Sequence, residues 1–141
     1  MKKFIAVLFL MSGLTLFSQS DNMIGEYYLK LGDDKHLIEY RLTLNQDQTF
    51  IFHSYVNHEA GMPQIINEYG KGNWTADGKI ISFFSDNEKD FDEKNTLDLS
   101  NSRARFITKP SRDKTDRIIK TRLKFFESEI FWIEGLDIFK V

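Results

Sequence analysis

The chain of 141 residues contains no cysteine. Disulfide bonds therefore cannot stabilise it, and it has neither a thiolate nucleophile nor thiolate ligands for a metal. Proline is also scarce, with two residues, whereas phenylalanine occurs thirteen times. This composition favours many short strands over disorder.

The chain has no excess of positive charge. Residues 21–141 hold 17 Lys and Arg against 21 Asp and Glu, a net charge of −4, because Lys2 and Lys3 precede them. A basic surface is needed to bind phosphate groups, so the composition predicts no nucleic-acid partner.

Signatures of common catalytic sites are missing as well. The sequence has no Gly-x-Ser-x-Gly, no His-Glu-x-x-His and no phosphate-binding glycine loop. The acidic segment from Ser85 to Asn95 lacks the central Gly and the terminal Glu of a calcium loop, and we expect a solvated loop there. We therefore predict a protein that is not an enzyme and has no cofactor.

The start of the chain has the layout of a secretory signal peptide. Lys2 and Lys3 precede an apolar stretch from Phe4 to Leu16, and Ser18-Gln19-Ser20 offers small residues for cleavage. The alternative is a membrane anchor, but the apolar run is short for a span of about 20 residues. We predict that residues 1–20 are removed on export.

Residues 21–141 are predicted to form one domain. No Cys follows the apolar run, so we expect no lipid attachment. The predicted location is the periplasm or the cell exterior, with no stable membrane span after cleavage.

The strongest local signal is a β-hairpin around Asp77-Gly78, a preferred pair for a two-residue type I′ turn. Counting outward from that turn pairs Trp74 with Ile81 and Gly72 with Phe83. Side chains alternate along a strand, so these four residues share one face, which we predict to be the core.

A second hairpin precedes it, with a three-residue loop at Gln46-Asp47-Gln48. This loop pairs Leu44 with Phe50 and Leu42 with Phe52, and it directs all four to one side. Gln48 stands where such loops usually have Gly in the left-handed region. We therefore expect strain at this turn, or a longer turn.

Alternating patterns predict about eight to ten short antiparallel strands, and no convincing helical period follows residue 20. Such strands indicate an all-β barrel or sandwich. Near the end of the chain, a three-residue loop would pair Phe125 with Phe131 and a two-residue loop would pair it with Trp132. The predicted strands are Ile24–Leu31, His36–Leu44, Thr49–Val56, Ile65–Ala76, Lys79–Phe84, Thr96–Leu99, Ala104–Thr108, Arg117–Phe126, Ile130–Ile133 and Leu136–Val141.

Four short motifs carry a family resemblance. They are Gly25-Glu26-Tyr27, Leu42 to Phe50, Gly72-Asn73-Trp74 with Asp77-Gly78, and Ile138-Phe139-Lys140. With these motifs the sequence resembles the small bacterial lipocalin-like domains, and it is similar to the N-terminal barrel of the copper-resistance type envelope lipoproteins. The resemblance covers most of residues 21–141 and implies an up-and-down lipocalin-like β-barrel with an internal ligand cavity.

Two departures limit what the resemblance implies. Lipocalins usually carry Trp on the first strand, where this chain has Tyr27. The copper-resistance lipoproteins carry a Cys-x-x-Cys pair and a lipidated Cys, and this chain has none. Metal handling through thiols is therefore not carried over.

The three histidines are the first candidates for a metal site. His53 and His58 lie five residues apart with Glu59 beside them, and His36 is the third. Their spacing matches no recognised motif for zinc or copper. We expect surface or rim histidines and predict no metal site.

A ligand cavity is the candidate that we favour. A barrel of about eight strands is either packed solid or holds one small ligand. Gly70 and Gly72 are expected to leave space on the inner face. Glu68 on that face would orient a small hydrophobic or amphipathic ligand, or would be an acid with a raised pKa, a lip residue or a hydrogen-bonded core residue. The predicted ligand-binding residues are Tyr27, Tyr40, Phe50, Phe52, Glu68, Trp74 and Phe83.

The alternative function is a protein–protein interaction module of the cell envelope with a solid barrel. An exposed apolar patch can mark such a contact. The residues that we expect on outward faces are Ile51, Tyr55, Ile80, Trp132 and Phe139.

Overall fold

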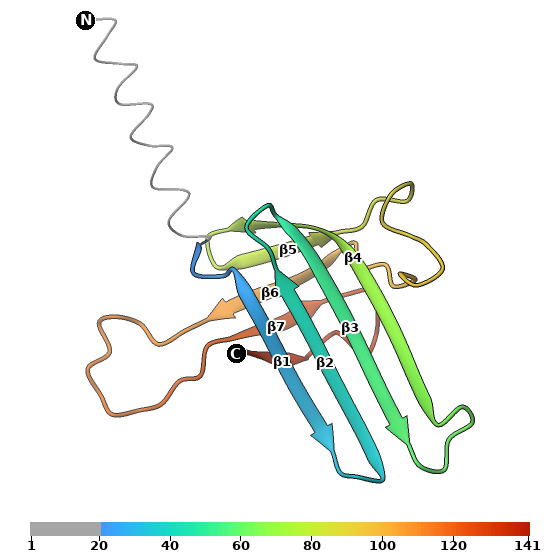
Figure 1. Ribbon diagram of the computed structural model, residues 1–141. Helices are drawn as coiled ribbons and strands as arrows, with labels where there is room; N and C mark the ends of the chain where they lie inside the picture. Colours follow the sequence, from blue (N-terminus) through green and yellow to red (C-terminus); the bar gives the residue numbers. More distant parts are fainter. Residues whose placement is uncertain (1–20) are drawn as a thin grey trace, which may run out of the picture.

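Eight strands form a closed antiparallel barrel in the computed structural model, which describes residues 21–141 (Figure 1). Each strand pairs with its neighbours in sequence, and β8 closes on β1. The predicted all-β up-and-down barrel is confirmed. The strands are β1 Gly25–Gly32, β2 His36–Leu44, β3 Thr49–His58, β4 Ile65–Asp77, β5 Ile80–Phe84, β6 Ser102–Ile107, β7 Arg122–Glu127 and β8 Asp137–Lys140.

Buried and exposed side chains alternate along the strands, as the alternating sequence patterns predict. In β6, Ser102, Ala104 and Phe106 are buried while Arg103 and Arg105 are exposed. Successive side chains of a strand point to opposite faces, so the period of two separates core from solvent. Among residues 21–141 there is no helix with the length and apolar character needed to cross a membrane. The predicted signal peptide at residues 1–20 lies outside the described residues.

The β2–β3 hairpin has the predicted register. Leu44 pairs with Phe50 and Leu42 with Phe52. Asn45 N donates to Thr49 O at 2.9 Å, which closes the three-residue loop. Gln48 has a φ of 67°, so a residue with a Cβ occupies the left-handed region where Gly was expected.

Replacing Gln48 by Gly is expected to raise the free energy of unfolding by about 0.5–1 kcal/mol. Relief of left-handed strain, about 1–2 kcal/mol, exceeds the extra entropy that Gly gives the unfolded chain. Urea denaturation measures the change. Asn101→Gly is the matched control, because Asn101 has a φ of 64° but Asn tolerates this region better. A gain at Asn101 as large as that at Gln48 would contradict the explanation.

The β4–β5 register differs from the prediction by two residues. The loop consists of Gly78 and Lys79, so Trp74 pairs with Phe83 and Asp77 with Ile80. Only Gly78 has a positive φ, 59°. A type I′ turn needs positive φ at both central residues, whereas type II′ needs it at the first alone. The shift is even, so Trp74 and Phe83 still face the core.

Two predicted strands are absent from the described residues, Thr96–Leu99 and Ile130–Ile133. The first lies in the connection from β5 to β6, where Leu97 and Leu99 pack into the core. The backbone N–H groups of Thr96 and Leu97 both donate to Tyr69 O, each at 2.9 Å. This anchors the connection against β4 without forming a strand.

The second lies in the connection from β7 to β8, residues 128–136, which forms turns. Phe125 N donates to Leu136 O at 2.9 Å, and Gly135 N donates to Phe125 O at 2.8 Å. Phe125 is therefore opposite Leu136, and both predicted pairings, with Phe131 and with Trp132, are wrong. The longer connection leaves enough chain to bury Ile133 in the core.

The barrel has two different ends. We call the near end the one that holds Asn22, the turns at 46–48 and 78–79, and the connection at 108–121. The far end holds the turns at 33–35 and 59–64. Strands β2, β3 and β4 have 9, 10 and 13 residues, whereas β8 has 4. The sheet β1–β4 consequently projects beyond the remaining strands at the far end (Figure 1).

Candidate functional site

Four of the predicted ligand-binding residues lie in a packed aromatic interior. Tyr27, Phe50, Trp74 and Phe83 are at most 3% exposed. The rings of Phe50 and Phe83 meet edge to face with centroids 5.1 Å apart, and Phe83 stacks on Phe125 at 5.4 Å. These rings fill the body of the barrel with one another.

The polar atoms in this interior already have partners. Trp74 Nε1 donates to Asn45 O at 3.1 Å, and the Tyr27 hydroxyl donates to Met23 O at 2.6 Å. Burial raises the pKa of Tyr27 far above its ordinary value. Both side chains therefore stabilise the near end of the barrel.

Gly70 and Gly72 do not open space in the core, contrary to the prediction. A Cβ on Gly70 would lie 2.8 Å from Leu99 Cδ1, and a Cβ on Gly72 would lie 2.1 Å from Phe84 O. The missing side chains are replaced by the β5–β6 connection and by the backbone of β5. These glycines allow close packing.

The other predicted residues, Tyr40, Phe52 and Glu68, lie nearer the far end, and Phe52 is 0% exposed. Tyr40, Ser54 and Glu68 lie side by side across β2, β3 and β4 in direct register. Tyr40 is 6% exposed and Ser54 is 4% exposed, while Glu68 is half-buried. Burial, with a smaller contribution from the Glu68 carboxylate, raises the pKa of Tyr40 above its ordinary value.

The oxygens of Tyr40 and Glu68 remain open to further hydrogen bonds. Neither side chain has a hydrogen-bond partner within residues 21–141. In the same range, every fully buried polar side-chain atom has such a partner, so the oxygens of Tyr40 and Glu68 are not fully buried. Their oxygen atoms therefore reach solvent at the far end. With the head of a bound molecule, the phenol can donate or accept a hydrogen bond, whereas the carboxylate can accept hydrogen bonds.

Trp132 covers these residues from the β7–β8 connection. Its ring stacks on Tyr40 with centroids 5.6 Å apart and an interplanar angle of 12°, and it lies 6.1 Å from Phe52. The prediction of an outward Trp132 is therefore wrong. We call Tyr40, Phe52, Ser54, Glu68 and Trp132 the rim site.

The inward face of the sheet continues past the rim site as an apolar surface. Leu31 pairs with Ile38, which pairs with Val56, which pairs with Ile66. Leu31 is 44% exposed and Ile66 is 42% exposed, although they lie on the face that forms the core further along the strands. An apolar molecule at the rim site would cover them.

The histidines do not gather into one site. His36 and His58 face each other across β2 and β3 with ring centroids 4.6 Å apart. His53 lies elsewhere, stacked on Tyr69 at 4.3 Å with its Nε2 2.8 Å from Asn67 Oδ1.

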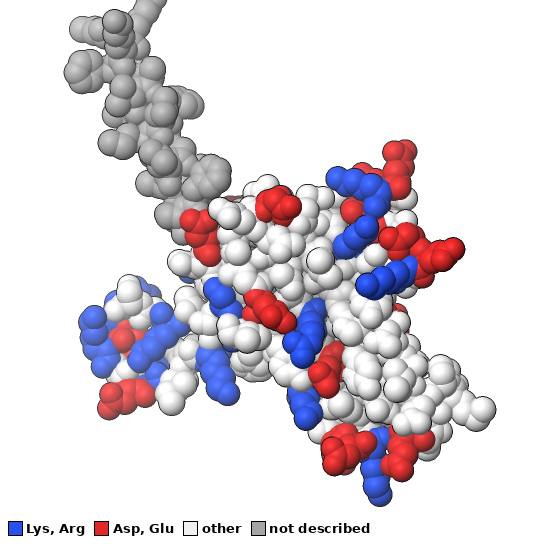
Figure 2. Space-filling model, viewed as in Figure 1, with Lys and Arg blue, Asp and Glu red and all other residues white. Residues whose placement is uncertain are grey.

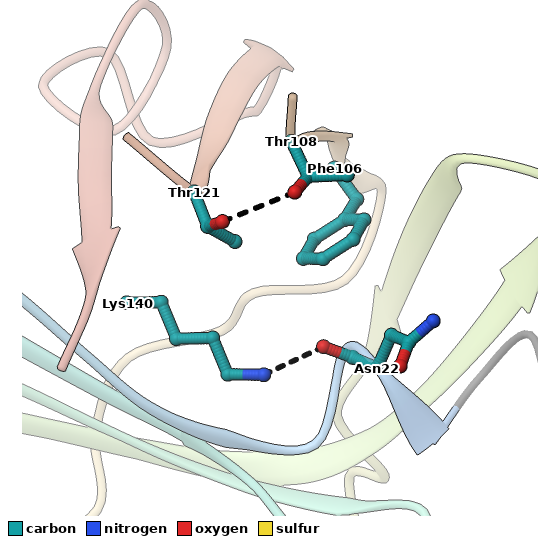
Figure 3. Close-up of a pocket in the computed structure, with 5 residues that line it drawn as sticks. All are labelled: Asn22, Phe106, Thr108, Thr121 and Lys140. Carbon is teal, nitrogen blue, oxygen red and sulfur yellow. Dashed lines mark hydrogen bonds between the residues drawn. The ribbon is translucent and has the colours of Figure 1, made fainter. Parts of the chain in front are cut away.

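A hollow of about 310 Å³ lies at the near end, lined by Asn22, Phe106, Thr108, Thr121 and Lys140 (Figure 3). Lys140 Nζ donates to Asn22 O at 2.6 Å, and the hydroxyls of Thr108 and Thr121 are 3.2 Å apart. Its polar groups thus bind one another and join β8 to the segment before β1.

Sequence reasoning missed two members of the rim site. Ser54 has the same parity as Phe52 on β3, so the alternation could have identified it. Trp132 gave no such signal, because its position depends on the path of a connection without regular structure.

Comparison with models of known protein families identifies a related domain. The model of the NlpE N-terminal domain matches residues 32–109. No curated protein and no solved structure matches the chain significantly. The matched range runs from the end of β1 through β6 and includes every residue of the rim site except Trp132.

Proposed function

Because this chain belongs to the family of the NlpE N-terminal domain, a barrel domain of cell-envelope proteins, we propose that it is a non-catalytic domain that binds a small amphipathic molecule at the rim site. The observation that carries this proposal is the half-exposed apolar face beside Tyr40 and Glu68. Binding sites are commonly apolar with a few placed polar groups, and this arrangement has that character.

The chemistry of the rim site selects the ligand class. The apolar part would lie on Leu31 and Ile66, which are still in contact with water, and its burial would drive binding. The polar head would lie at Tyr40 and Glu68. A carboxylate accepts hydrogen bonds and attracts positive charge, so a head that donates or carries a positive charge is preferred.

We propose in addition that the protein reaches the envelope by cleavage of residues 1–20 and without a lipid anchor. The basic start, the apolar run and the absence of cysteine support this. The intact mass of the native protein tests it, and a chain that retains Met1 would contradict it.

Nile red, a neutral apolar dye, is expected to bind the folded protein, and Trp132→Ala should weaken that binding about tenfold. Fluorescence titration measures the affinity. Phe131→Ala is the matched control, because Phe131 lies in the same connection but is 86% exposed. Equal losses in the two variants would contradict binding at the rim site.

The preference for a positive head is tested by displacing the dye with dodecyltrimethylammonium or with dodecyl sulfate. The cationic amphiphile should compete better, and Glu68→Gln should abolish the difference. Glu59→Gln, at an exposed residue of the neighbouring turn, should leave it unchanged. No dye binding to the folded wild type would leave the interaction module as the better reading.

One observation favours that second function. Ile51 lies on the outer face of β3 and is 52% exposed, and Phe84 on β5 is 57% exposed. The other predicted outward residues, Tyr55, Ile80 and Phe139, are partly covered. Concentration-dependent self-association or partner binding that is lost in Ile51→Lys would support this function.

A further inference from the structure

The connection from β6 to β7 projects from the near end of the barrel and is strongly basic. Residues 109–122 hold six Lys and Arg and two Asp, which gives this segment a net charge of +4. Residues 21–141 as a whole have a net charge of −4. Figure 2 shows blue residues gathered on this projection, at the left of the view. We call residues 109–122 the basic loop.

Internal contacts use some of these charges and leave others free. Arg117 Nη2 binds Asp113 Oδ2 at 2.7 Å, and Lys109 Nζ donates to Thr115 O. Arg112, Lys114 and Lys120 are exposed, and none of them forms an ion pair within residues 21–141. The loop is therefore held in shape by one set of cations and presents another set outward.

An apolar element stands among these cations. Ile118 is 87% exposed in the middle of the basic loop. Beside it lies a hollow of about 520 Å³, lined by Ile107, Ile118, Ile119, Lys120, Arg122, Asp137 and Phe139. Lys120 Nζ lies 5.8 Å from the centre of the Phe139 ring, so a cation lies beside the apolar residues that line this hollow.

The opposite end of the barrel carries the opposite charge. The β5–β6 connection, on the far-end side, holds Asp86, Glu88, Asp90, Asp92, Glu93 and Asp98 against Lys89 and Lys94. An anionic surface would attract the basic loop and repel this connection, which sets one orientation of the molecule.

We propose that the basic loop docks the near end of the barrel on an anionic phospholipid surface. Arg112, Lys114 and Lys120 would contact the headgroups, and Ile118 would enter the boundary between headgroups and acyl chains. Cations combined with an exposed apolar side chain suit a membrane interface, where the first attract anionic lipid and the second is buried. An acidic protein would satisfy the cations but gives no reason for the exposure of Ile118 among them.

Binding to vesicles tests this proposal with the protein expressed as the full chain and purified from the envelope fraction. One set of vesicles contains phosphatidylcholine alone, and the other contains phosphatidylglycerol as a third of the lipid. We expect sedimentation with the anionic vesicles only, decreasing as salt screens the charges. Equal binding to both vesicle types would overturn the proposal, because binding would then not depend on the attraction between the basic loop and anionic headgroups.

Charge variants locate the binding surface. Neutralising Arg112, Lys114 and Lys120 to Gln should weaken anionic-vesicle binding by about 100-fold at low salt, since each cation near such a surface contributes about fivefold. The matched control neutralises Lys30, Lys35 and Lys89, three exposed cations outside the basic loop, to Gln. A similar loss in both triple variants would show a net-charge effect and overturn the proposal.

The apolar contact has its own pair of variants. Ile118→Ser should weaken binding several-fold, whereas Phe131→Ser, at an equally exposed residue of the β7–β8 connection, should not. Binding of the wild type to a soluble polyanion such as heparin with the same affinity as to anionic vesicles, unaffected by Ile118→Ser, would favour an acidic macromolecule and overturn the membrane assignment.

Discussion

Replacing Trp74 by Ala is expected to lower the free energy of unfolding by about 3–5 kcal/mol. Trp74 is 1% exposed and is the largest of the fully buried side chains. Its removal leaves a cavity in the body of the barrel, and neighbouring rings on fixed strands fill such a cavity only in part.

A second contribution comes from the indole hydrogen bond that joins two hairpins. Trp74 Nε1 donates to Asn45 O at 3.1 Å, whereas the backbone bond from Trp74 N to Gln48 O at 2.8 Å is kept in the alanine variant. The indole therefore connects β4 to the strained turn between β2 and β3. Its loss should increase hydrogen exchange at the amide of Gln48, which donates to Asn45 O at 3.1 Å.

Urea denaturation of three variants separates these contributions. Trp74→Phe keeps most of the volume and loses the N–H donor, so it should lose about 1–2 kcal/mol. Trp132→Ala removes an equally large side chain that is only partly buried at the rim site, and it should cost less than Trp74→Ala. Equal losses for the two alanine variants would show that Trp74 is not the centre of the core.

The alternation of apolar residues was sufficient to predict which side chains form the core. Leu42, Leu44, Phe50 and Phe52 are all 0% exposed, as their parity requires. A register error of two residues leaves each side chain on the same face of the sheet. This explains why Trp74 was placed correctly in the core although its predicted pairing partner was wrong. The turn decided the register, and Asp77-Gly78 gives two possible loops, of which the structure uses Gly78-Lys79.

The connections could not be predicted in the same way. Leu97 and Leu99 enter the core without belonging to a strand, because Gly70 has no side chain and they pack closely against its backbone. Trp132 reaches Tyr40 because the β7–β8 connection is long enough to fold back. The positions of these side chains depend on the space that other elements leave in the barrel. A local pattern of apolar residues in the sequence does not predict that space.

The same limit applied to the candidate site. Tyr40, Phe52 and Glu68 were predicted to share a face, and they do. The division of that face into a packed interior and a half-exposed apolar surface at Leu31 and Ile66 depends on how far β1–β4 extend beyond the short β8. Strand lengths at the end of the chain were overestimated, so this division was not visible in the sequence.

Replacing Gly72 by Ala is expected to lower the free energy of unfolding by about 3 kcal/mol, at the upper part of the range for overpacking. The new Cβ would lie 2.1 Å from Phe84 O and 2.9 Å from Phe50 Cε1. The first neighbour is a backbone atom of β5, so no rotamer change can relieve the contact. Strands β4 and β5 would have to separate where Asn73 pairs with Phe84.

Gly70→Ala and Gly78→Ala distinguish this steric cost from others. At Gly70 the nearest atom to the added Cβ is Leu99 Cδ1, the end of a flexible side chain, so a smaller loss is expected. At Gly78 nothing lies within 4 Å, but φ is 59°, so the loss of about 1–2 kcal/mol reflects backbone strain alone. Urea denaturation ranks the three variants. If Gly72→Ala unfolds no more easily than Gly70→Ala, the backbone of β5 yields to the added methyl group, and the close approach of β4 and β5 is not what requires glycine at residue 72.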